Sequence, residues 1–244
     1  MNEPKIQLVY LAIRRPAYEQ VGEQPREFYY GSDTLREDAA FSFRACWGSN
    51  AFLRMVFFPV QRMLAAFSGV GFRLEQVLTH YHALRNADVI YGETDACGLP
   101  VVFLKRLGLI HGAVGFISAG LINILEQKQK TIGFRFYRWL LQGADFIVCW
   151  SPLEERLYRE LVGARAHFVR LEADTSFFVR DPAVHREEYA LCVGRDVGRD
   201  WATLFEALEH TGISTKVVTS AHRVEGLTLP PTAELVTQHV SYPA

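Results

Sequence analysis

The sequence lacks closely spaced cysteines and any recognisable export signal. Its four cysteines stand at positions 46, 97, 149 and 192, so no CxxC pair or zinc-ribbon spacing is present. Cys149 and Cys192 fall inside apolar runs, which predicts that both are buried as small hydrophobic side chains. The N-terminal segment, MNEPKIQLVYLAIRR, has neither the basic start nor the long apolar core of a signal peptide. These absences favour a cytoplasmic protein in a reducing compartment.

A long uninterrupted apolar run is also missing. The nearest approach covers residues 51–72, AFLRMVFFPVQRMLAAFSGVGF, and contains Arg54, Pro59 and Arg62. Charged residues are costly inside a bilayer, so this run does not predict an ordinary membrane-spanning helix.

Net charge is nearly absent as well. The 26 Lys and Arg against 27 Asp and Glu argue against a dedicated nucleic-acid-binding protein. A hydrophobic content of 49% excludes a disordered chain, and 244 residues allow one large or two smaller domains. The charge is unevenly divided, with 20 basic and 16 acidic residues over 1–171 but 6 and 11 over 172–244. This division predicts a domain boundary near residue 172.

Short apolar runs alternate with helical patterns in the part of the chain before this boundary. We expect strands at residues 6–12, 88–91, 113–117, 146–150 and 167–171. We expect helices at residues 53–67 with a break at Pro59, at 73–86, at 100–107, and from Pro152 to Gly163. Residues 13–52 show little periodicity and predict loops. Strand–helix–strand repeats of this length predict an α/β, Rossmann-like domain with a mostly parallel sheet.

The pattern restarts after an aperiodic connector at residues 172–188. A strand at 189–193, a loop at 194–200, a helix at 201–209 with Asp200 as N-cap, and a strand at 215–218 follow. Two strands and a helix bury too little surface to close a doubly wound core. We therefore expect domains at 1–171 and 189–244, the second being an incomplete Rossmann-like domain in a chain that is cut short. The alternative is a short appendage on the first domain.

Ligands bind outside the carboxyl ends of strands in open parallel sheets, and this rule selects three loops of the first domain. The candidate residues are Arg14 and Arg15 after the first strand, Glu93 and Asp95 after the second, and Ser118 and Gly120 after the third.

The loop at 194–200 is the most informative segment of the second domain. Gly194 and Gly198 allow backbone amides to approach an anion at a helix N-terminus, and Arg195 and Arg199 add donors suited to phosphate oxygens. A nucleoside diphosphate is the natural ligand. The alternative is a solvated turn whose arginines pair with Asp196 and Asp200. The spacing is neither the GxGxxG pattern of dinucleotide sites nor a Walker loop, which disfavours an NAD enzyme.

Three segments resemble the group 1 (family four) glycosyltransferases, which have the GT-B fold. Residues 189–220, YALCVGRDVGRDWATLFEALEHTGISTKVVTS, resemble the start of the family's nucleotide-sugar domain. Residues 144–178 contain ADFIVCWSP and EADTSFF, which are similar to the strand and the closing segment of its N-terminal domain. Residues 87–106 fit the acceptor-domain loop and helix more loosely.

The resemblance implies a retaining hexosyltransferase that uses a UDP- or GDP-hexose as substrate, with no metal and no cofactor. It implies donor contacts at Gly194, Arg195, Arg199, Thr219 and Ser220, with Arg199 standing near the family's usual lysine. Glu93 and Asp95 are the candidate catalytic residues on the acceptor side, where a structural role in the loop is the alternative for each. Arg14, Arg15, Ser118 and Gly120 belong to the acceptor-side loops. A glycan or lipid-linked acceptor is implied, as in polysaccharide biosynthesis.

The chain also departs from the family pattern. The paired-glutamate element that holds the donor sugar lies beyond residue 244, and Arg14-Arg15-Pro16 replaces the N-terminal glycine-rich loop. The family's acceptor-domain histidine has no clear counterpart. A noncatalytic binding protein or pseudoenzyme is therefore the alternative function, and another nucleotide-binding α/β enzyme is a third.

Two basic and aromatic segments raise the question of a membrane surface. Residues 51–73 contain three arginines and no acidic residue, and residues 126–142, EQKQKTIGFRFYRWLLQ, have a net charge of +3. Such helices can lie on an anionic bilayer, which here means peripheral contact with the inner face of the membrane. The alternative is an ordinary amphipathic helix that covers the sheet. Nucleic-acid binding is disfavoured because no recognition fold accompanies the charge.

Overall fold

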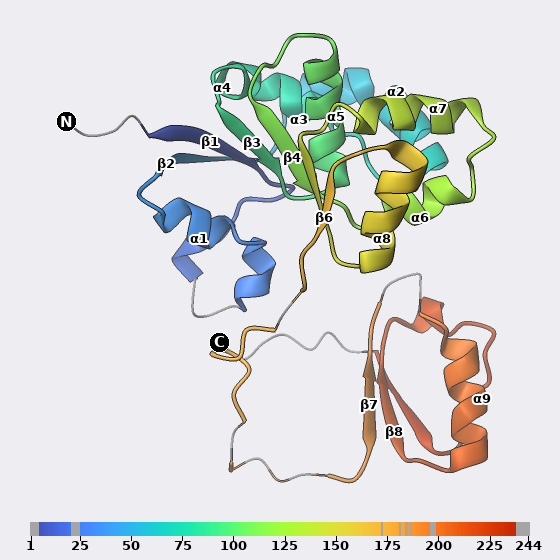
Figure 1. Cartoon of the computed structure of the whole chain (residues 1–244). Helices are drawn as coiled ribbons and strands as arrows, with labels where there is room; N and C mark the ends of the chain where they lie inside the picture. Colours follow the sequence, from blue (N-terminus) through green and yellow to red (C-terminus); the bar gives the residue numbers. More distant parts are fainter. Residues whose placement is uncertain are drawn as a thin grey trace. The chain divides into compact units, whose positions relative to one another are not determined.

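The computed structural model describes residues 5–20, 25–171, 173–180, 182–183, 185, 187–195 and 199–237. The chain divides into two compact units, Met1–Phe178 and Val179–Ala244, and each has its own sheet and core (Figure 1). The division falls within the connector expected at residues 172–188.

Unit 1 contains a six-stranded parallel sheet with the strand order β2-β1-β3-β4-β5-β6. Its strands are β1 (Ile6–Leu11), β2 (Phe41–Cys46), β3 (Val89–Gly92), β4 (Ala113–Ile117), β5 (Phe146–Cys149) and β6 (Ala166–Phe168). All carboxyl ends of the strands therefore meet at one edge, as the predicted βαβ pattern requires.

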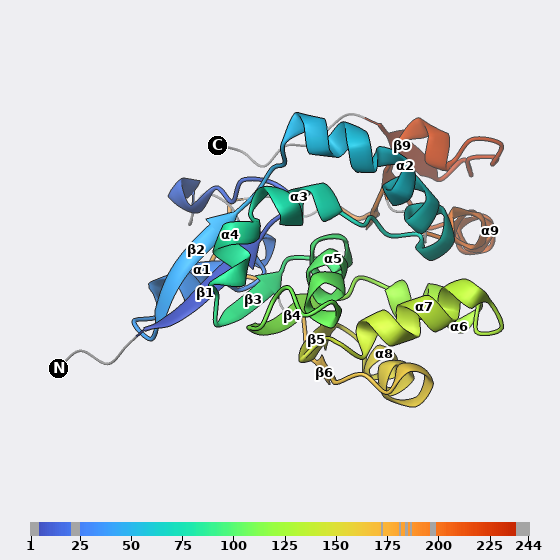
Figure 2. The same cartoon turned by 90° about the horizontal axis from the view of Figure 1, so that it is seen from above.

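Helices cover mainly one face of this sheet, as Figure 2 shows. They are α2 (Ala51–Ser68), α3 (Leu74–Thr79), α4 (Tyr81–Arg85), α5 (Asp95–Arg106), α6 (Leu121–Glu126), α7 (Ile132–Leu141) and α8 (Pro152–Leu157). A short continuation of α8, Tyr158–Val162, ends at Gly163, whose positive φ of 74° closes the helix as predicted. Val9 and Leu11 point into this helical core, whereas Leu8 and Tyr10 point to the opposite face.

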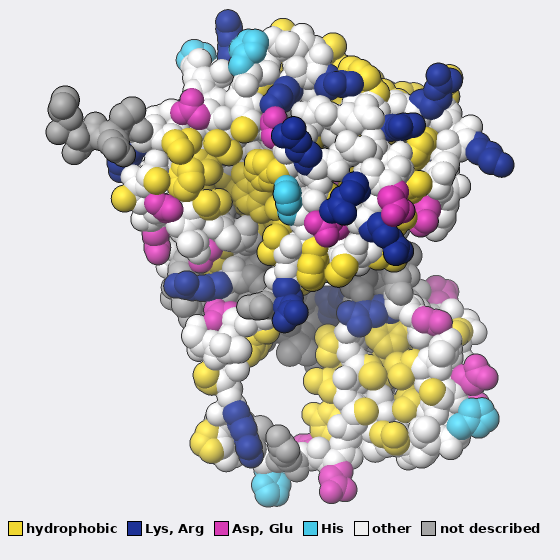
Figure 3. Space-filling view, in the orientation of Figure 1, with side chains coloured by type: hydrophobic (Ala, Val, Ile, Leu, Met, Phe, Trp, Pro, Cys, Tyr) yellow, Lys and Arg dark blue, Asp and Glu magenta, His cyan; other side chains and the backbone are white. Residues whose placement is uncertain are grey.

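That opposite face is covered only in part. The six-residue helix α1 (Ser32–Glu37) packs there, and short helical turns lie at Tyr18–Gln20 and Arg26–Tyr29. A hollow of about 590 Å³ remains, lined by side chains such as Leu8, Phe41, Tyr91 and Phe146. Figure 3 shows hydrophobic side chains gathered over the strands on this side of the unit.

Three of the expectations for unit 1 were wrong. Residues 41–46 form the edge strand β2, whose phenylalanines at 41 and 43 alternate with polar residues. The alternation is too short to distinguish it from the aperiodic segment around it. Helix α2 continues through Pro59 without a break. The helix predicted over 73–86 divides into α3 and α4 at His80.

A fourth difference bears on the candidate site. Helix α5 begins at Asp95 rather than at Pro100, because the amides of Cys97 and Gly98 already donate to the Thr94 carbonyl. Pro100 has no amide hydrogen for the Ala96 carbonyl one turn before it. The Arg73 amide donates to that carbonyl instead, at 2.9 Å, so a long-range hydrogen bond allows the proline inside the helix.

Unit 2 has a three-stranded parallel sheet in the order β7-β8-β9. Its elements are β7 (Ala190–Val193), α9 (Trp201–Thr211), β8 (Thr215–Val218), a helical turn at Ala221–Arg223, and β9 (Ala233–Val236). The first three follow the prediction closely, and β9 was not predicted. The core centres on Trp201, Phe205, Leu208 and Val217. Cys149 is buried as predicted, but Cys192 is only half-buried.

The described part of the chain contains no helix of sufficient length and apolar character to cross a membrane.

Candidate functional site

The predicted donor residues gather at the carboxyl edge of the unit 2 sheet. Gly194 follows β7 and Thr219 follows β8, and the paired register of Val193 with Val218 places these two loops side by side. The Gly194 amide donates to the Val218 carbonyl at 3.1 Å, which fixes the start of the loop. Ser220 is next to Thr219 and half-buried. Asp196 and Gly198, which the predicted phosphate loop includes, lie outside the described residues.

The side chain of Arg199 lies directly against Gly194. A Cβ atom built on Gly194 stands 2.4 Å from Nε of Arg199, so a larger residue at 194 displaces the guanidinium group. Arg199 directly precedes Asp200, the N-cap of α9, whose Oδ1 accepts from the Thr203 amide at 3.1 Å. Hydrogen bonds from Thr203 hold the pKa of the Asp200 carboxyl below its usual value. The Arg199 guanidinium therefore stands beside the N-terminus of the 11-residue helix α9. Its charge and the positive end of the helix dipole favour an anion there, while the Asp200 carboxylate opposes one.

Two buried polar atoms at this edge have no protein partner in the described residues. They are Oγ1 of Thr219, a fully buried residue, and Nε1 of Trp201, the first residue of α9. Buried polar groups are normally hydrogen-bonded, so each is a candidate for a ligand contact. A cavity of about 520 Å³ is lined by Trp201 and by residues that include Arg199 and Asp200.

Sequence reasoning missed Arg223. Its Nε donates to the Arg195 carbonyl at 2.8 Å, which brings a third arginine to the loops after β7 and β8. The Trp201 nitrogen was also missed, because helical spacing marked the residue only as part of the buried face. The sequence did offer a signal for Arg223, because it lies five residues after the strand at Thr215–Val218, which Thr219 and Ser220 follow directly.

On unit 1, the carboxylate of Glu93 connects the loops after β3 and β1. Its Oε2 accepts from the Ile13 amide at 2.5 Å, and the Ile13 carbonyl accepts from the Arg73 guanidinium at 3.2 Å. The pKa of Glu93 is raised overall, because the effect of burial outweighs the Ile13 amide and the positive charges of Arg73 and Arg14, which act to lower it. Arg73 was not predicted as a site residue, since only the packing of α3 brings it to the sheet edge.

Asp95 is almost fully buried in the first turn of α5. Its Oδ2 accepts from the Ala119 amide at 2.8 Å and so joins the loop after β3 to the loop after β4. The other oxygen, Oδ1, has no protein partner in the described residues. Burial raises the pKa of Asp95 to about 7, against the opposing effect of the Ala119 amide. The Ala119 contact gives Asp95 a role in holding these two loops together.

Ser118 and Gly120 shape the loop after β4. Ser118 is fully buried, and its hydroxyl is hydrogen-bonded to the Tyr158 hydroxyl at 2.6 Å. Gly120 has a φ of 86° and precedes α6, a conformation that a residue with a Cβ adopts only with strain. Both residues therefore hold the loop in position.

Arg14 and Arg15 are exposed after β1. Arg15 lies 3.9 Å from the Glu19 carboxylate and 5.9 Å from the centre of the Trp47 ring. A hollow of about 380 Å³ lies there, lined by residues that include Arg15, Tyr18, Arg36 and Trp47.

His80 lies where α3 gives way to α4, and its Nε2 is 2.9 Å from the Trp47 carbonyl. No group of three or more His, Cys, Asp or Glu side chains suited to a metal ion occurs in the described part of the chain.

Sequence comparison finds no family profile and no curated protein that matches this chain. Structural comparison does find matches. A structure of trehalose-6-phosphate synthase, from work on glycosyl transfer with retention, matches 96% of this chain and 73% of its own, with a TM-score of 0.63 and 12% identity. A structure of the E. coli protein with bound UDP-2-fluoro glucose matches 96% of this chain and 74% of its own, with a TM-score of 0.62 and 11% identity. At these identities the likeness concerns the fold, and it confirms the predicted fold class: the chain has the α/β, GT-B-type fold of these glycosyltransferases.

Proposed function

We propose that the chain is a glycosyltransferase that binds a UDP- or GDP-hexose at the carboxyl edge of the unit 2 sheet and transfers the hexose to a hydroxyl acceptor. The observation that carries the proposal is the position of Arg199 against Gly194 at the start of α9. The unpartnered Oγ1 of Thr219 and Nε1 of Trp201 support it, because a bound donor offers them hydrogen-bond partners. The fold shared with an E. coli structure that holds UDP-2-fluoro glucose supports it as well.

In this proposal the second unit stabilises the leaving group. The bond between the anomeric carbon and the donor phosphate oxygen breaks, and a bond from that carbon to the acceptor oxygen forms. The acceptor proton passes to the departing phosphate, and the sugar keeps its anomeric configuration. Arg195 and Arg199 supply positive charge to the diphosphate as negative charge develops on it, which is electrostatic catalysis without a metal or cofactor. Thr219 and Ser220 contact the nucleotide.

The first unit binds the acceptor in this proposal. Glu93 is the group that accepts a hydrogen bond from the acceptor hydroxyl, because it is only half-buried and stands between the loops after β1 and β3. Asp95 acts as a positioning residue through the Ala119 amide, as do Ser118 and Gly120 through their loop. Arg14 and Arg15 contact an anionic or polar part of a glycan or lipid-linked acceptor.

Calorimetric titration of the full chain with UDP and with GDP tests the donor site. We expect Arg199→Ala and Arg195→Ala each to weaken binding of the preferred nucleotide by about 1–3 kcal/mol, or roughly 5- to 150-fold. This is the loss expected for a hydrogen bond to a charged group. Arg85→Ala, at an exposed arginine of unit 1, is the matched control and leaves the affinity unchanged. Unchanged affinity in both unit 2 variants contradicts the assignment.

Turnover separates the enzyme from its alternative, a noncatalytic binding protein. A transferase releases nucleoside diphosphate from a UDP- or GDP-hexose in the presence of hydroxyl acceptors, and Glu93→Gln lowers that rate without changing nucleotide affinity. Tight nucleotide binding with no release across a panel of acceptors contradicts the transferase proposal and favours the binding protein.

A further inference from the structure

Helix α2 exposes an unusual amount of apolar surface. Among its 18 residues only Ser68 is buried. Phe52, Met55, Val56, Val60 and Met63 recur at intervals that place them on one side of the helix, and Phe52, Met55 and Met63 are 65–68% exposed. A surface helix of a globular protein normally has its polar side chains on the solvent side. We call these five residues the apolar stripe.

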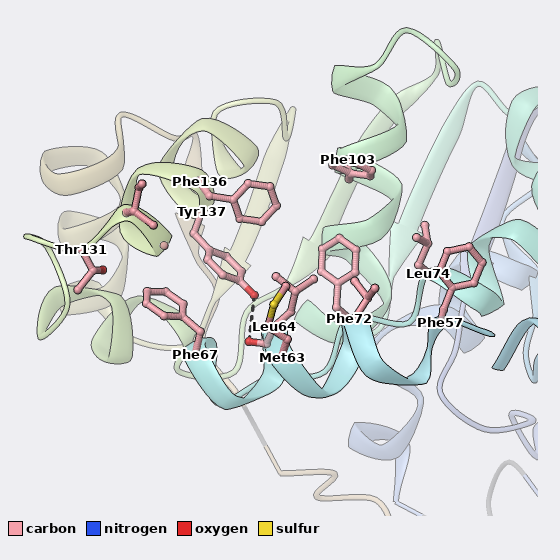
Figure 4. Close-up of a pocket in the computed structure, with 13 residues that line it drawn as sticks. Phe57, Met63, Leu64, Phe67, Phe72, Leu74, Phe103, Thr131, Phe136 and Tyr137 are labelled. Carbon is pink, nitrogen blue, oxygen red and sulfur yellow. Dashed lines mark hydrogen bonds between the residues drawn. The ribbon is translucent and has the colours of Figure 1, made fainter. Parts of the chain in front are cut away.

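The apolar stripe continues into a groove. Figure 4 shows this groove between α2 and α7, with Phe103 of α5 beside it. Its volume is about 630 Å³, and nearly all the side chains around it are apolar. Val60 and Met63 belong to both the stripe and the groove, and Ile132 on the α7 side is 86% exposed. The Tyr137 hydroxyl faces inward, 3.4 Å from the Leu64 carbonyl, so it adds no polar group to the opening.

Positive charge surrounds this surface. Residues 51–73 contain three arginines and no acidic residue, and residues 126–142 contain four basic residues and one acidic residue, for a net charge of +3. Arg54, Arg62 and Arg135 are exposed, and Arg62 lies 5.8 Å from the centre of the Phe58 ring. Glu75 is buried and accepts a hydrogen bond from Gln61 of α2, so its carboxylate adds little to the exposed surface. The inner side of α7 packs in the core through Phe134 and other apolar residues, as an ordinary amphipathic helix does.

We propose that the face formed by α2 and the start of α7 is a docking surface for an anionic phospholipid bilayer. Helix α2 lies in the plane of the interface with the apolar stripe among the upper acyl groups, and the groove takes part of an acyl chain. The arginines contact the anionic headgroups. A second copy of the chain fits this face less well, because a symmetric contact brings the same positive charges together. The inference does not depend on transferase activity.

Vesicle co-sedimentation of the full chain tests the proposal. We expect binding to vesicles that mix phosphatidylcholine with phosphatidylglycerol, weaker binding to vesicles of phosphatidylcholine alone, and partial release by added salt. Absence of binding to the anionic vesicles overturns the proposal, and so does equal binding to both vesicle types.

A double variant locates the surface. Met55→Glu with Met63→Glu removes two exposed apolar contacts and adds negative charge without touching a buried residue, and we expect it to weaken binding at least about tenfold. Leu153→Glu with Ile213→Glu makes the same charge change at exposed apolar residues elsewhere and leaves binding unchanged. Circular dichroism confirms that both fold. Equal vesicle binding by the two double variants overturns the proposal. It is also overturned if the unsubstituted chain does not bind vesicles but forms a dimer in solution that only the α2 double variant dissociates.

A second pair isolates the charge. Arg54→Gln with Arg62→Gln keeps the apolar stripe, and we expect about tenfold weaker binding or more, since each basic residue near an anionic surface contributes about fivefold. Arg85→Gln with Arg165→Gln changes two other exposed arginines and serves as the control. An effect of the same size in the control shows a nonspecific response to net charge and overturns the assignment to α2.

Discussion

The two sheets of this protein hold different charged groups at edges that are built alike. In each unit, loops after parallel strands lead into helices. The first edge combines the carboxylates of Glu93 and Asp95 with nearby arginines, whereas the second gathers Arg195, Arg199 and Arg223. The shared architecture supplies a place for a ligand, and the side chains decide which one. Carboxylates accept hydrogen bonds from hydroxyl groups, and guanidinium groups donate to phosphates.

The units also differ in how much core supports these edges. Phe116 of β4 is fully buried in the large core of unit 1, where it packs so closely on Gly98 that a Cβ there meets its ring at 2.3 Å. Phe205 of α9 belongs to the small core of unit 2. We expect Phe116→Ala to lower the free energy of unfolding by about 4 kcal/mol and Phe205→Ala by about 3 kcal/mol or less, because a small core relaxes more easily around a cavity.

Urea unfolding followed by circular dichroism measures both variants. Phe116→Leu is the conservative control, for which we expect a smaller loss. A larger loss for Phe205→Ala than for Phe116→Ala contradicts this view of the two cores.

The buried charge of Asp95 predicts a pH effect specific to unit 1. Its pKa is raised by burial from 3.8 to about 7, so between these values the folded state binds more protons than the unfolded state. The contribution of Asp95 to the free energy of unfolding therefore falls as pH rises through that window and stays low above it. At 1.36 kcal/mol per pKa unit, the total loss is up to about 4 kcal/mol. Asp95→Asn removes this dependence.

The comparison is made on urea unfolding at pH 5 and pH 8. We expect Asp95→Asn to be more stable than the unsubstituted chain at pH 8, with the difference shrinking towards pH 5. Glu206→Gln, at an exposed carboxyl group of α9, is the control and leaves the pH dependence unchanged. A difference that does not vary with pH refutes the buried-charge explanation.

Two hydroxyl groups give the smallest and most discriminating effects. Ser118→Ala leaves the buried Tyr158 hydroxyl without its partner and should cost about 1–3 kcal/mol of unfolding free energy.

Thr219→Val removes a hydroxyl that has no protein partner in the described residues, so we expect a change of less than about 1 kcal/mol in the free energy of unfolding, towards higher stability. Nucleotide titration of Thr219→Val should nevertheless show weaker binding, because the proposed donor uses that hydroxyl. A loss of stability with unchanged affinity places Thr219 in the core rather than in the site.

Much of the fold followed from local patterns. The Asp200 N-cap, the strand at Thr215–Val218 and the closing glycine at 163 depend on neighbouring residues alone, and the structure confirms each of them. Strand β2 and the start of α5 depend on distant partners. The first pairs with β1, and the second tolerates Pro100 because Arg73 supplies the missing donor.

The candidate site divides in the same way. Gly194 and Arg199 are five positions apart in one loop, so the sequence alone predicts that they lie near each other. The structure places the Arg199 side chain against Gly194. Arg73 reaches its sheet edge through packing and a contact with Ile13, for which the sequence gives no local signal. Arg223 contacts the Arg195 carbonyl, and its local signal is its position five residues after β8.

The sequence by itself determined most of the strands and helices other than β2 and β9, the Asp200 cap of α9, and the residue types in each loop, because periodicity and capping act within a few residues. Only the tertiary structure decided which loops share an edge, that Asp95 is buried, and that the apolar stripe of α2 remains on the surface. Burial and partnership are properties of residues brought together from far apart in the chain. The pKa of a carboxyl group and the exposure of a methionine therefore depend on packing that no short segment contains.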